Sequence, residues 1–357
     1  MIGGIWETLF STIPVNLRFV KGPSHLILLN PACGITNSFY KLMNQKEHIS
    51  AYIRQEAALL GFAACGIAPA APLSEDGKHL NAWLQKGYQA KMDYMQKHKD
   101  LRSDPGLLVE NASSVIVFLY NYYPSKTMDV HSPYLISTYA YGQDYHDVIR
   151  EKLNILIAKL KELVPEISIR GFVDSAPVLE RAWAMRAGLG WIGKNSMLIS
   201  KRNGSYFFIS ELITNIELEY DQPMGGNYCG DCSRCMDACP TKAITGLQEV
   251  DANKCISYLT IENKGEIPES FKGKYEKWIF GCDICQQVCP WNRYSSPHNE
   301  PAFEPPPTLM ELGKKEWENM DSEQYNSLFR KSAVKRAKFA GLKRNIDFVT
   351  DSELSAE

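Results

Sequence analysis

The sequence predicts an α/β fold, with α+β character, that carries a cysteine-rich insert and ends in a short helical tail. Patterns typical of helices and of buried strands alternate through residues 43–222. Eight of the ten cysteines lie between Cys229 and Cys289. Segments rich in proline and glycine flank this cysteine-rich region, at 221–227 and 297–307, and indicate linkers.

These observations divide the chain into four regions. We expect an N-terminal extension over 1–42, to which no function is assigned, and an α/β domain over 43–222. A cysteine-rich domain over 223–295 follows, and a helical, basic tail over 296–357 closes the chain.

The expected elements of the α/β domain alternate along the chain. Three segments have the length and apolar composition of buried strands: 113–123, 167–174 and 205–215. Three others place apolar residues at helical spacing: 45–62, 144–164 and 176–188. In the last of these, Pro177 suits the first helical turn and Gly188 suits the C-terminal cap.

The composition is that of an ordinary globular protein, with 357 residues, 45% hydrophobic residues and a net charge of −2. This charge excludes a surface that binds polyanions everywhere, so any nucleic-acid contact must be local. The longest apolar runs fall short of the roughly 18 to 20 residues of a membrane span, and the N-terminus has neither a secretory signal nor a twin-arginine pair. We expect a cytoplasmic protein in which Cys33 and Cys65 are small buried side chains.

The first cysteine run has the spacing C-x2-C-x2-C-x3-C-P and comprises Cys229, Cys232, Cys235 and Cys239. Bacterial ferredoxins use this run for 4Fe-4S clusters: three thiolates bind one cluster and the fourth binds its neighbour. A zinc site is the weaker alternative, because it requires neither the third cysteine in phase nor the closing proline. The run therefore predicts a ferredoxin-like domain.

A second run, formed by Cys282, Cys285 and Cys289, lacks the leading cysteine of the full pattern. Two 4Fe-4S clusters need about eight thiolates, and counting assigns Cys255 as the missing one. In the crossed arrangement, cluster one takes Cys229, Cys232, Cys235 and Cys289. Cluster two takes Cys239, Cys255, Cys282 and Cys285. Clusters pass single electrons, so another group must receive them.

Seven stretches over about residues 47–345 carry a family resemblance: "ASSVIVFLYNYYP", "YAYGQDYHDVIREKL", "VDSAPVLERAWAMRAGLGWIGKNSMLI", "GSYFFISELITN", "YCGDCSRCMDACPTKAI", "CISYLTIE" and "GCDICQQVCPWN". Together they resemble epoxyqueuosine reductase, a cobalamin-dependent family that completes queuosine in tRNA. The resemblance implies a catalytic domain of nitroreductase-like character over 43–222 that binds base-off cobalamin. It also implies that the clusters reduce the cobalt, and that the cofactor converts the epoxide of epoxyqueuosine to an alkene with release of water.

The resemblance implies that Asp174 is the general acid and a cobalamin contact. A positioned acid lowers such a barrier by typically 10²- to 10⁴-fold in rate. From the residues alone, the N-cap of the helix that follows is the favoured role for Asp174, and the resemblance shifts the preference to the acid. An acid near neutral pH would need a raised pKa, which burial under a corrin ring could provide.

Six further positions match cobalamin contacts through the resemblance: Arg102, Ser137, Lys194, Asn195, Leu198 and Ser257. Ordinary surface or capping roles are an equal alternative for the arginine and the two serines. His146 begins like the D-x-H-x-x-G motif of cobalt-ligating histidines, but position 149 is isoleucine instead of glycine. We therefore expect His146 to form hydrogen bonds or pack rather than bind cobalt.

A basic segment in the tail is the expected tRNA contact, through Lys335, Arg336, Lys338, Lys343 and Arg344. A solvated helix face is the alternative. The substrate implied by the resemblance is a tRNA with a GUN anticodon that carries epoxyqueuosine. Tyr139, Tyr141 and Tyr145 suit either the lining of a base pocket or the core.

Two other functions share the cysteine pattern. A reductive dehalogenase also combines cobalamin with two clusters, but the twin-arginine signal that such enzymes normally carry is absent here. A plain electron-transfer protein would hold iron without cobalamin. As an enzyme, the chain would need an external low-potential electron donor, such as a flavodoxin or ferredoxin, and we expect it to act as a monomer.

Overall fold

The computed structural model describes residues 18–21, 26–29, 45–128 and 131–354, and the chain divides into two compact units, Met1–Ser50 and Ala51–Glu357. In the first unit, β1 (Arg18–Lys21) and β2 (Leu26–Leu29) form an antiparallel pair. Cys33 lies outside the described residues. The expected boundaries at 222 and 295 both fall inside the second unit and remain proposals.

A four-stranded antiparallel sheet organises the second unit, in the order β3-β4-β9-β6. Its strands are β3 (Ala64–Pro69), β4 (Ser114–Asn121), β6 (Ile169–Phe172) and β9 (Phe207–Thr214). All eight residues of β9 and seven of the eight in β4 are buried, as expected for central strands covered on both faces. The sheet therefore forms the middle layer of the unit.

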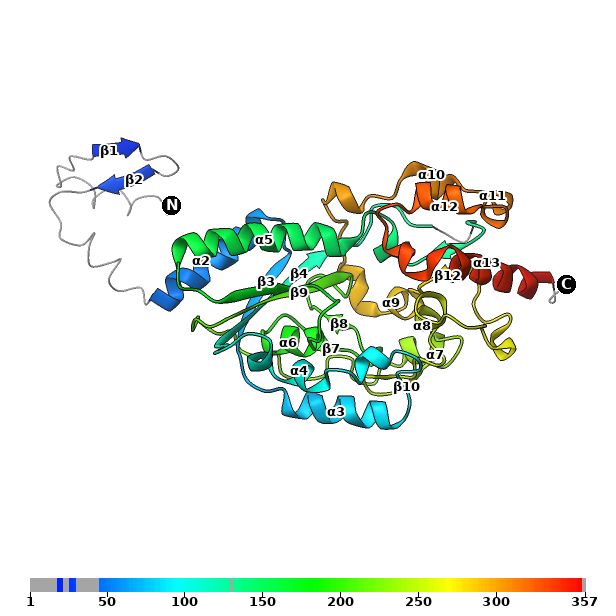
Figure 1. Cartoon of the computed structure of the whole chain (residues 1–357), viewed down its shortest axis with the longest axis horizontal. Coiled ribbons are helices and arrows are strands. Elements are labelled where there is room, and N and C mark those ends of the chain that lie inside the picture. The colour runs from blue at the N-terminus through cyan, green and yellow to red at the C-terminus, as the bar shows by residue number, and fades with distance from the viewer. Residues whose placement is uncertain (1–17, 22–25, 30–44, 129–130, 355–357) are drawn as a thin grey trace, which may run out of the picture. The chain divides into compact units, whose positions relative to one another are not determined.

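Helices cover the two faces of this sheet (Figure 1). The helix α5 (Tyr145–Leu163) lies along one face, and α6 (Glu180–Arg186) and α3 (Ser74–Gln85) lie along the other. On the α6 face, Trp183 packs among the apolar side chains of β4, β6 and β9. Burying each large apolar side chain contributes roughly 1.5–3 kcal/mol. This layering confirms the expected mixed helix and strand architecture.

The cysteine-rich segment and the tail consist of short elements. The segment contains α7 (Arg234–Ala238), β10 (Ile244–Gly246), β11 (Glu249–Val250), α8 (Ile256–Ile261), β12 (Trp278–Phe280) and α9 (Ile284–Gln287). The tail contains α10 (Pro307–Glu311), α11 (Lys314–Glu318), α12 (Ser322–Leu328) and α13 (Lys338–Leu354). β12 pairs in parallel with β5 (Leu135–Ile136), which connects the segment to the α/β part of the chain. None of the described helices has the length and apolarity that crossing a membrane requires.

The predicted elements are confirmed, with one boundary error. The helix expected over 176–188 begins only at Glu180, so Pro177 precedes it instead of occupying its first turn. Gly188 does follow the helix with φ +75°, and a Cβ there would lie 2.6 Å from the carbonyl oxygen of Gln222. The helix α2 (Gln45–Leu59) matches its expected start, whereas β3 and α3 were not predicted.

Candidate active site and cluster ligands

Asp174 lies just beyond β6, in a left-handed backbone conformation with φ +49°. This conformation is uncommon outside glycine, although aspartate tolerates it better than most residues. It directs the side chain toward the first turn of α5, where Tyr145 donates a hydrogen bond to the Asp174 carboxylate. The Asp174 side chain remains 56% exposed, so a substrate can reach it. The helix α6 has Leu179 at its N-cap position, which excludes the capping role for Asp174.

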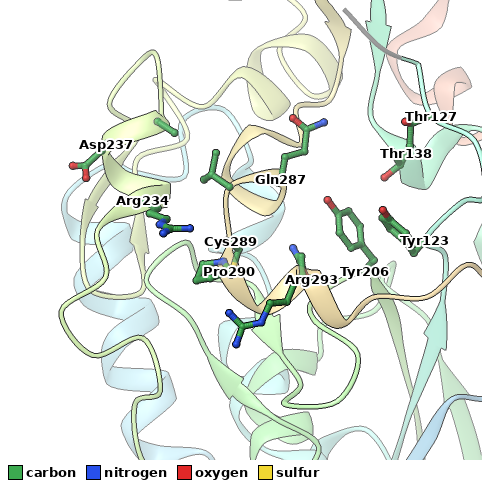
Figure 2. A pocket seen from close by; sticks show the side chains of 13 residues that line it. Tyr123, Thr127, Thr138, Tyr206, Arg234, Asp237, Gln287, Cys289, Pro290 and Arg293 are labelled. Atoms are coloured by element: carbon green, nitrogen blue, oxygen red, sulfur yellow. The ribbon is translucent and has the colours of Figure 1, made fainter.

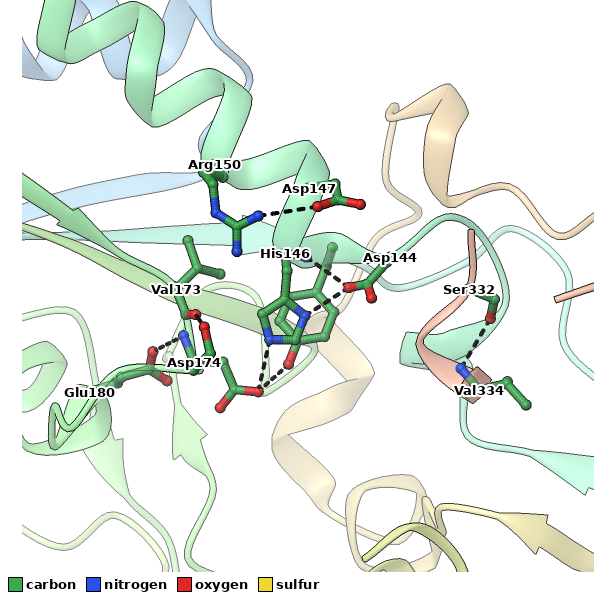
Figure 3. A network of polar contacts seen from close by, with 11 residues as sticks. Asp144, His146, Asp147, Arg150, Val173, Asp174, Glu180, Ser332 and Val334 are labelled. Carbon is green, nitrogen blue, oxygen red and sulfur yellow. Dashed lines mark hydrogen bonds and ion pairs between the residues drawn. The ribbon is translucent and has the colours of Figure 1, made fainter. Parts of the chain in front are cut away.

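His146 connects two carboxylates at this point (Figure 3). Its Nδ1 atom lies 2.7 Å from Oδ1 of Asp144, and its Nε2 atom lies 3.5 Å from Oδ2 of Asp174. Asp144 is also the N-cap of α5, because its Oδ1 accepts a 3.0 Å hydrogen bond from the His146 backbone N–H. One aspartate therefore both starts the helix and orients the imidazole, in agreement with the hydrogen-bonding role expected for His146.

The two carboxylates hold a proton on His146. Burial by itself lowers the pKa of His146, but the hydrogen bonds with Asp144 and Asp174 outweigh it and raise the pKa to about 9. Partial desolvation raises the pKa of the half-exposed Asp174 carboxyl, but the hydrogen bonds from His146 and Tyr145 outweigh it and leave the pKa below its usual value. The raised pKa expected for Asp174 is thus not found in this arrangement, because the neighbouring imidazolium stabilises the carboxylate.

Two glutamates near Asp174, Glu180 and Glu211, were not predicted from the sequence as site residues. Glu180 accepts a 2.6 Å hydrogen bond from the backbone N–H of Asp174, and burial raises the pKa of the Glu180 carboxyl. Glu211 pairs across the sheet with Val117 and Phe172, so its side chain lies on the apolar α6 face. Glu211 is completely buried, and among the described residues neither of its carboxylate oxygens has a hydrogen-bond partner. Its signal in the sequence was a lone acid inside the strand "FFISELIT".

Burial raises the pKa of Glu211 well above its usual value, and the negative charges of Glu180 and Asp174 raise it further. The site thus brings together an aspartate with a lowered pKa, a histidine with a raised pKa and a buried glutamate with a raised pKa.

Four of the residues expected to contact cobalamin lie at the junction between the sheet and the cysteine-rich segment. Ser137 donates a hydrogen bond to the buried Asp283, whose Oδ2 accepts a 2.8 Å bond from the backbone N–H of Thr138. Lys194 Nζ donates to the carbonyl of Cys232 at 3.0 Å, and Asn195 Nδ2 donates to the carbonyl of Cys285 at 3.3 Å. The fourth, Ser257, belongs to α8, directly after Cys255.

The other two predicted cofactor contacts lie elsewhere. Arg102 lies in α4 (Lys99–Ser103), where burial lowers the pKa of its guanidinium and the negative charges of Glu180 and Asp174 act in the opposite direction. Its buried Nε atom has no hydrogen-bond partner within the described ranges. Leu198, in the strand β8 (Leu198–Ile199) that pairs with β7 (Trp191–Ile192), is 4% exposed and belongs to the hydrophobic core. The geometry therefore gives Leu198 a packing role.

The tyrosines considered as pocket lining separate into two groups. Tyr145 reaches the site through Asp174, and its ring stacks on Phe208 at 4.0 Å between centroids. Tyr139 contacts Phe208 edge-on, and the hydroxyl of the buried Tyr141 accepts a 3.0 Å hydrogen bond from the backbone N–H of Met128. Tyr141 is therefore a core residue, and only Tyr145 touches the candidate acid.

The electrostatic neighbours of the thiols fall into two groups. Burial raises the pKa of Cys235, and Cys229, Cys289 and Cys232 raise it further. Burial likewise raises the pKa of Cys282, with contributions from Cys285 and Cys255, whereas Cys255 itself senses Cys239. One interaction joins the two groups, from Cys235 to Cys285. The crossed assignment obtained by counting remains a prediction.

The thiols do not converge on a single point. In the described part of the chain, no three His, Cys, Asp or Glu side chains form a site for one metal ion. A 4Fe-4S cluster does not require such convergence, because each thiolate binds a different iron atom. Cys65 lies apart, in β3, where it is half-buried instead of fully buried as expected, and burial raises the pKa of its thiol to about 12.

A cavity of about 940 Å³ adjoins the first cluster region (Figure 2). Its lining includes Cys289, Tyr123 and Tyr206, together with Arg234 and Arg293. The residues of the Asp174 network do not line this cavity.

Three of the five cations expected to contact tRNA are engaged within the protein. Arg336 forms a bidentate ion pair with Glu262, at 2.7 and 2.9 Å, and Lys343 pairs with Asp347 at 2.9 Å. The guanidinium of Arg344 donates to three backbone carbonyls, those of Leu259, Asn263 and Gly265. Lys335 and Lys338 are exposed and show no ion pair within the described residues.

Comparison with known proteins identifies the family. The model described as "Epoxyqueuosine reductase QueG, DUF1730" matches residues 102–175, and the "4Fe-4S double cluster binding domain" model matches residues 228–292. The epoxyqueuosine reductase of Cellulophaga algicola is 52% identical over 307 residues, which cover 86% of this chain and 100% of the relative. The chain belongs to the epoxyqueuosine reductase family. It is thus an oxidoreductase with a domain for two 4Fe-4S clusters.

Solved structures of epoxyqueuosine reductases share its fold. One, crystallised with an epoxyqueuosine-modified tRNA-Tyr stem loop, has a TM-score of 0.79 and 30% identity, covering 85% of this chain and 80% of that one. The Bacillus subtilis enzyme, with its catalytic aspartate loop swung out of the active site, has a TM-score of 0.78 and 30% identity, with 85% and 81% covered.

Proposed function

We propose that this epoxyqueuosine reductase uses base-off cobalamin and two 4Fe-4S clusters, and that Asp174 delivers protons to the substrate oxygen. The main support for the proposal is the contact between His146 and Asp174. It places the Asp174 carboxylate beside an imidazole that stays protonated at neutral pH, at an exposed edge of the sheet. A relative with a catalytic aspartate on a movable loop gives independent support. Asp174 likewise follows a strand and lies outside any helix.

The residues present suit the two kinds of cofactor. The thiols form two electrostatic groups of four, as two clusters require. The buried Nε atom of Arg102, without a partner in the described part of the chain, suits a carbonyl oxygen such as those of corrin side-chain amides. Arg102, Ser137, Asn195 and Ser257 would hold the corrin, in a domain that we compare with nitroreductases. Bound cobalamin would supply the low-valent cobalt that attacks the epoxide, with the clusters as its electron source.

The overall reaction converts an epoxide to an alkene and water, and it consumes two electrons and two protons. Asp174 is ionised at rest, so it must receive each proton before it can pass it to the substrate oxygen. His146 holds such a proton at neutral pH, 3.5 Å from Asp174. Asp144 stabilises the imidazolium and fixes its orientation, and Tyr145 holds the Asp174 carboxylate in place. We therefore assign Asp174 as the acid and His146 as the residue that reprotonates it.

The substrate we propose is tRNA with a GUN anticodon, as the stem-loop complex of a relative supports. Lys335 and Lys338 remain available to contact phosphates, since Arg336, Lys343 and Arg344 have partners within the chain. An external low-potential carrier would provide the electrons, and the chain would act as a monomer.

Anaerobic reconstitution tests this proposal. The chain is loaded with iron, sulfide and hydroxocobalamin, and cobalt is measured after gel filtration; epoxyqueuosine-containing tRNA is then added with a reductant. The proposal predicts retained cobalt and conversion of the nucleoside to queuosine by mass spectrometry. An iron-replete chain that retains no corrinoid, yet forms queuosine, would overturn the cobalamin assignment.

A further inference from the structure

The two groups of thiols differ in how close they lie to solvent. Exposed residues surround the first group, among them Tyr228, Asp231 and Arg234. Buried residues surround the second group, where Gly281, Asp283, Ile284 and Gln286 flank Cys282 and Cys285. Ser137 and Asn195, which we assign to the corrin, contact this buried second group. Electrons that enter from outside must therefore arrive at cluster one.

Three chain segments meet at the surface over cluster one. The Lys201 ammonium lies 3.8 Å from the ring centroid of Tyr228, and Trp291 Nε1 donates to the Tyr228 carbonyl at 3.3 Å. Ser295 donates to the carbonyl of Asn203 at 3.0 Å. These contacts bring the turn 201–204, the loop 228–237 and the segment 289–295 together. We call this surface the cluster-one face.

The cluster-one face combines exposed aromatic rings with excess positive charge. Tyr228 is 39% exposed and Tyr294 is 44% exposed. Four exposed cations belong to it: Lys201, Arg202, Arg234 and Arg293. Two exposed acids accompany them, Asp231 and Asp237. The face is therefore positive within a chain whose net charge is −2, and its aromatic rings favour a protein contact.

The cavity of about 940 Å³ gives solvent and small groups access to a ligand of cluster one (Figure 2). Cys289 lines this cavity together with Arg234 and Arg293. Electron tunnelling slows steeply with distance, so a donor must come close to a cluster ligand. An anionic group that the two arginines draw into this cavity would approach a cluster-one thiolate.

We infer that the cluster-one face docks a small, acidic, one-electron carrier protein. Complementary charge would steer the encounter, and the limited area suits the small, short-lived interfaces of redox partners. The inference rests on the proposed cluster assignment and adds the entry point of the electrons. In the transfer, one electron leaves the reduced carrier and enters cluster one, and no bond forms or breaks.

A tRNA contact is the competing use of a basic, aromatic surface. The face lies at the thiols, however, and not at Asp174, where the target base must arrive. The structure therefore favours the carrier, and tRNA binding becomes an outcome of the test.

The test uses the full chain with both clusters reconstituted and reduced flavodoxin as the carrier. Stopped-flow bleaching of cluster absorbance gives the second-order rate at low and at high salt. Arg234→Glu and Arg293→Glu should each lower this rate at low salt, by about tenfold or more in the double variant. Arg293→Lys should retain the rate, as should Lys161→Glu, an exposed cation near the distal end of α5.

Three further measurements distinguish damaged clusters, a tRNA-binding face and a failed cobalamin assignment. Cluster reduction by reduced methyl viologen should stay unchanged in the variants, which shows that the clusters are intact. An unchanged flavodoxin rate in the double variant would overturn the inference, as would weakened tRNA binding with normal flavodoxin oxidation. If the wild-type chain accepts electrons from flavodoxin but takes up no corrinoid, the proposed function fails while the docking face stands.

Discussion

The Nε2 atom of His146 lies 3.5 Å from Oδ2 of Asp174, and its Nδ1 atom lies 2.7 Å from Oδ1 of Asp144. An imidazole between two carboxylates keeps its proton at neutral pH, and the pKa of His146 is accordingly raised to about 9. The proton therefore belongs to the pair of His146 and Asp174, and the acid cannot be understood from Asp174 alone.

The pH dependence of catalysis follows from this pair. Because the pair must hold a proton, wild-type single-turnover rates should fall as pH rises through about 9. His146→Gln should be slower and should lose activity from a lower pH, because a carboxyl group, Asp174, is then the only acid of the pair, and the hydrogen bond from Tyr145 still acts to lower its pKa. Product formation measured by mass spectrometry across the pH range checks this, with cobalamin content as the control.

Asp144→Asn provides a matched variant, because asparagine caps helices as well as aspartate does. It removes the charge beside Nδ1 of His146 and should move the alkaline limit to lower pH with little loss of stability. An alkaline limit that stays at the wild-type pH in both variants would contradict the assignment of His146.

Glu211 should make the protein less stable at neutral pH than an apolar residue would. Folding raises the pKa of Glu211, so the folded state keeps a proton that the unfolded state releases. Its contribution to stability is complete below about pH 4.3 and is lost as pH rises from there. Glu211→Leu should therefore raise the free energy of unfolding at pH 8 by about 1–3 kcal/mol, with a smaller gain near pH 4.

Thermal or urea unfolding at several pH values measures this gain. Ile209→Leu, on the same face of β9, controls for repacking and should show no such pH dependence. A Glu211→Leu protein that is less stable at every pH would show that the carboxyl makes favourable contacts after all.

Iron content tests the crossed cluster assignment. Cys255→Ser should lose cluster two and retain about four of about eight irons per chain, because one ligand is missing. Cys65→Ser should retain them all, since Cys65 lies in β3 apart from both groups. Full iron content in the Cys255 variant would reject Cys255 as a ligand.

The tail cations should divide into two classes. Replacing Lys335 and Lys338 with glutamine should weaken tRNA binding and lower the slope of log affinity against log salt by up to about 0.9 per lost contact. Arg344→Gln should mainly reduce stability, because its guanidinium bonds three backbone carbonyls. An unchanged salt slope in the double lysine variant would place the tRNA contact elsewhere.

The sequence predicted the strands and helices well because apolar periodicity is a local property. It also grouped the cysteines, since ligand spacing and counting leave few alternatives. The predictions failed where contacts between distant parts of the chain determine the local structure. Asp174 adopts a left-handed conformation and α6 begins only at Glu180, after Pro177, and no local feature of the sequence predicts either.

Charges were harder still to interpret. The protonation of His146 depends on Asp174, which lies 28 residues further along the chain and meets it only in the fold. Arg336 and Arg344 read as free cations in a basic run, yet their partners come from residues 259–265. Glu211 was visible as an isolated acid in an apolar strand, and such a residue should be treated as a candidate functional group.

The most direct test of the central claim is single-turnover formation of queuosine by Asp174→Asn. The variant is loaded with clusters and cobalamin, bound to epoxyqueuosine-containing tRNA and reduced chemically, and the nucleoside is followed by mass spectrometry. Loss of the acid predicts a rate lower by about 10²- to 10⁴-fold, with cobalt content and tRNA affinity unchanged. Turnover at the wild-type rate would contradict the account and remove Asp174 from the reaction.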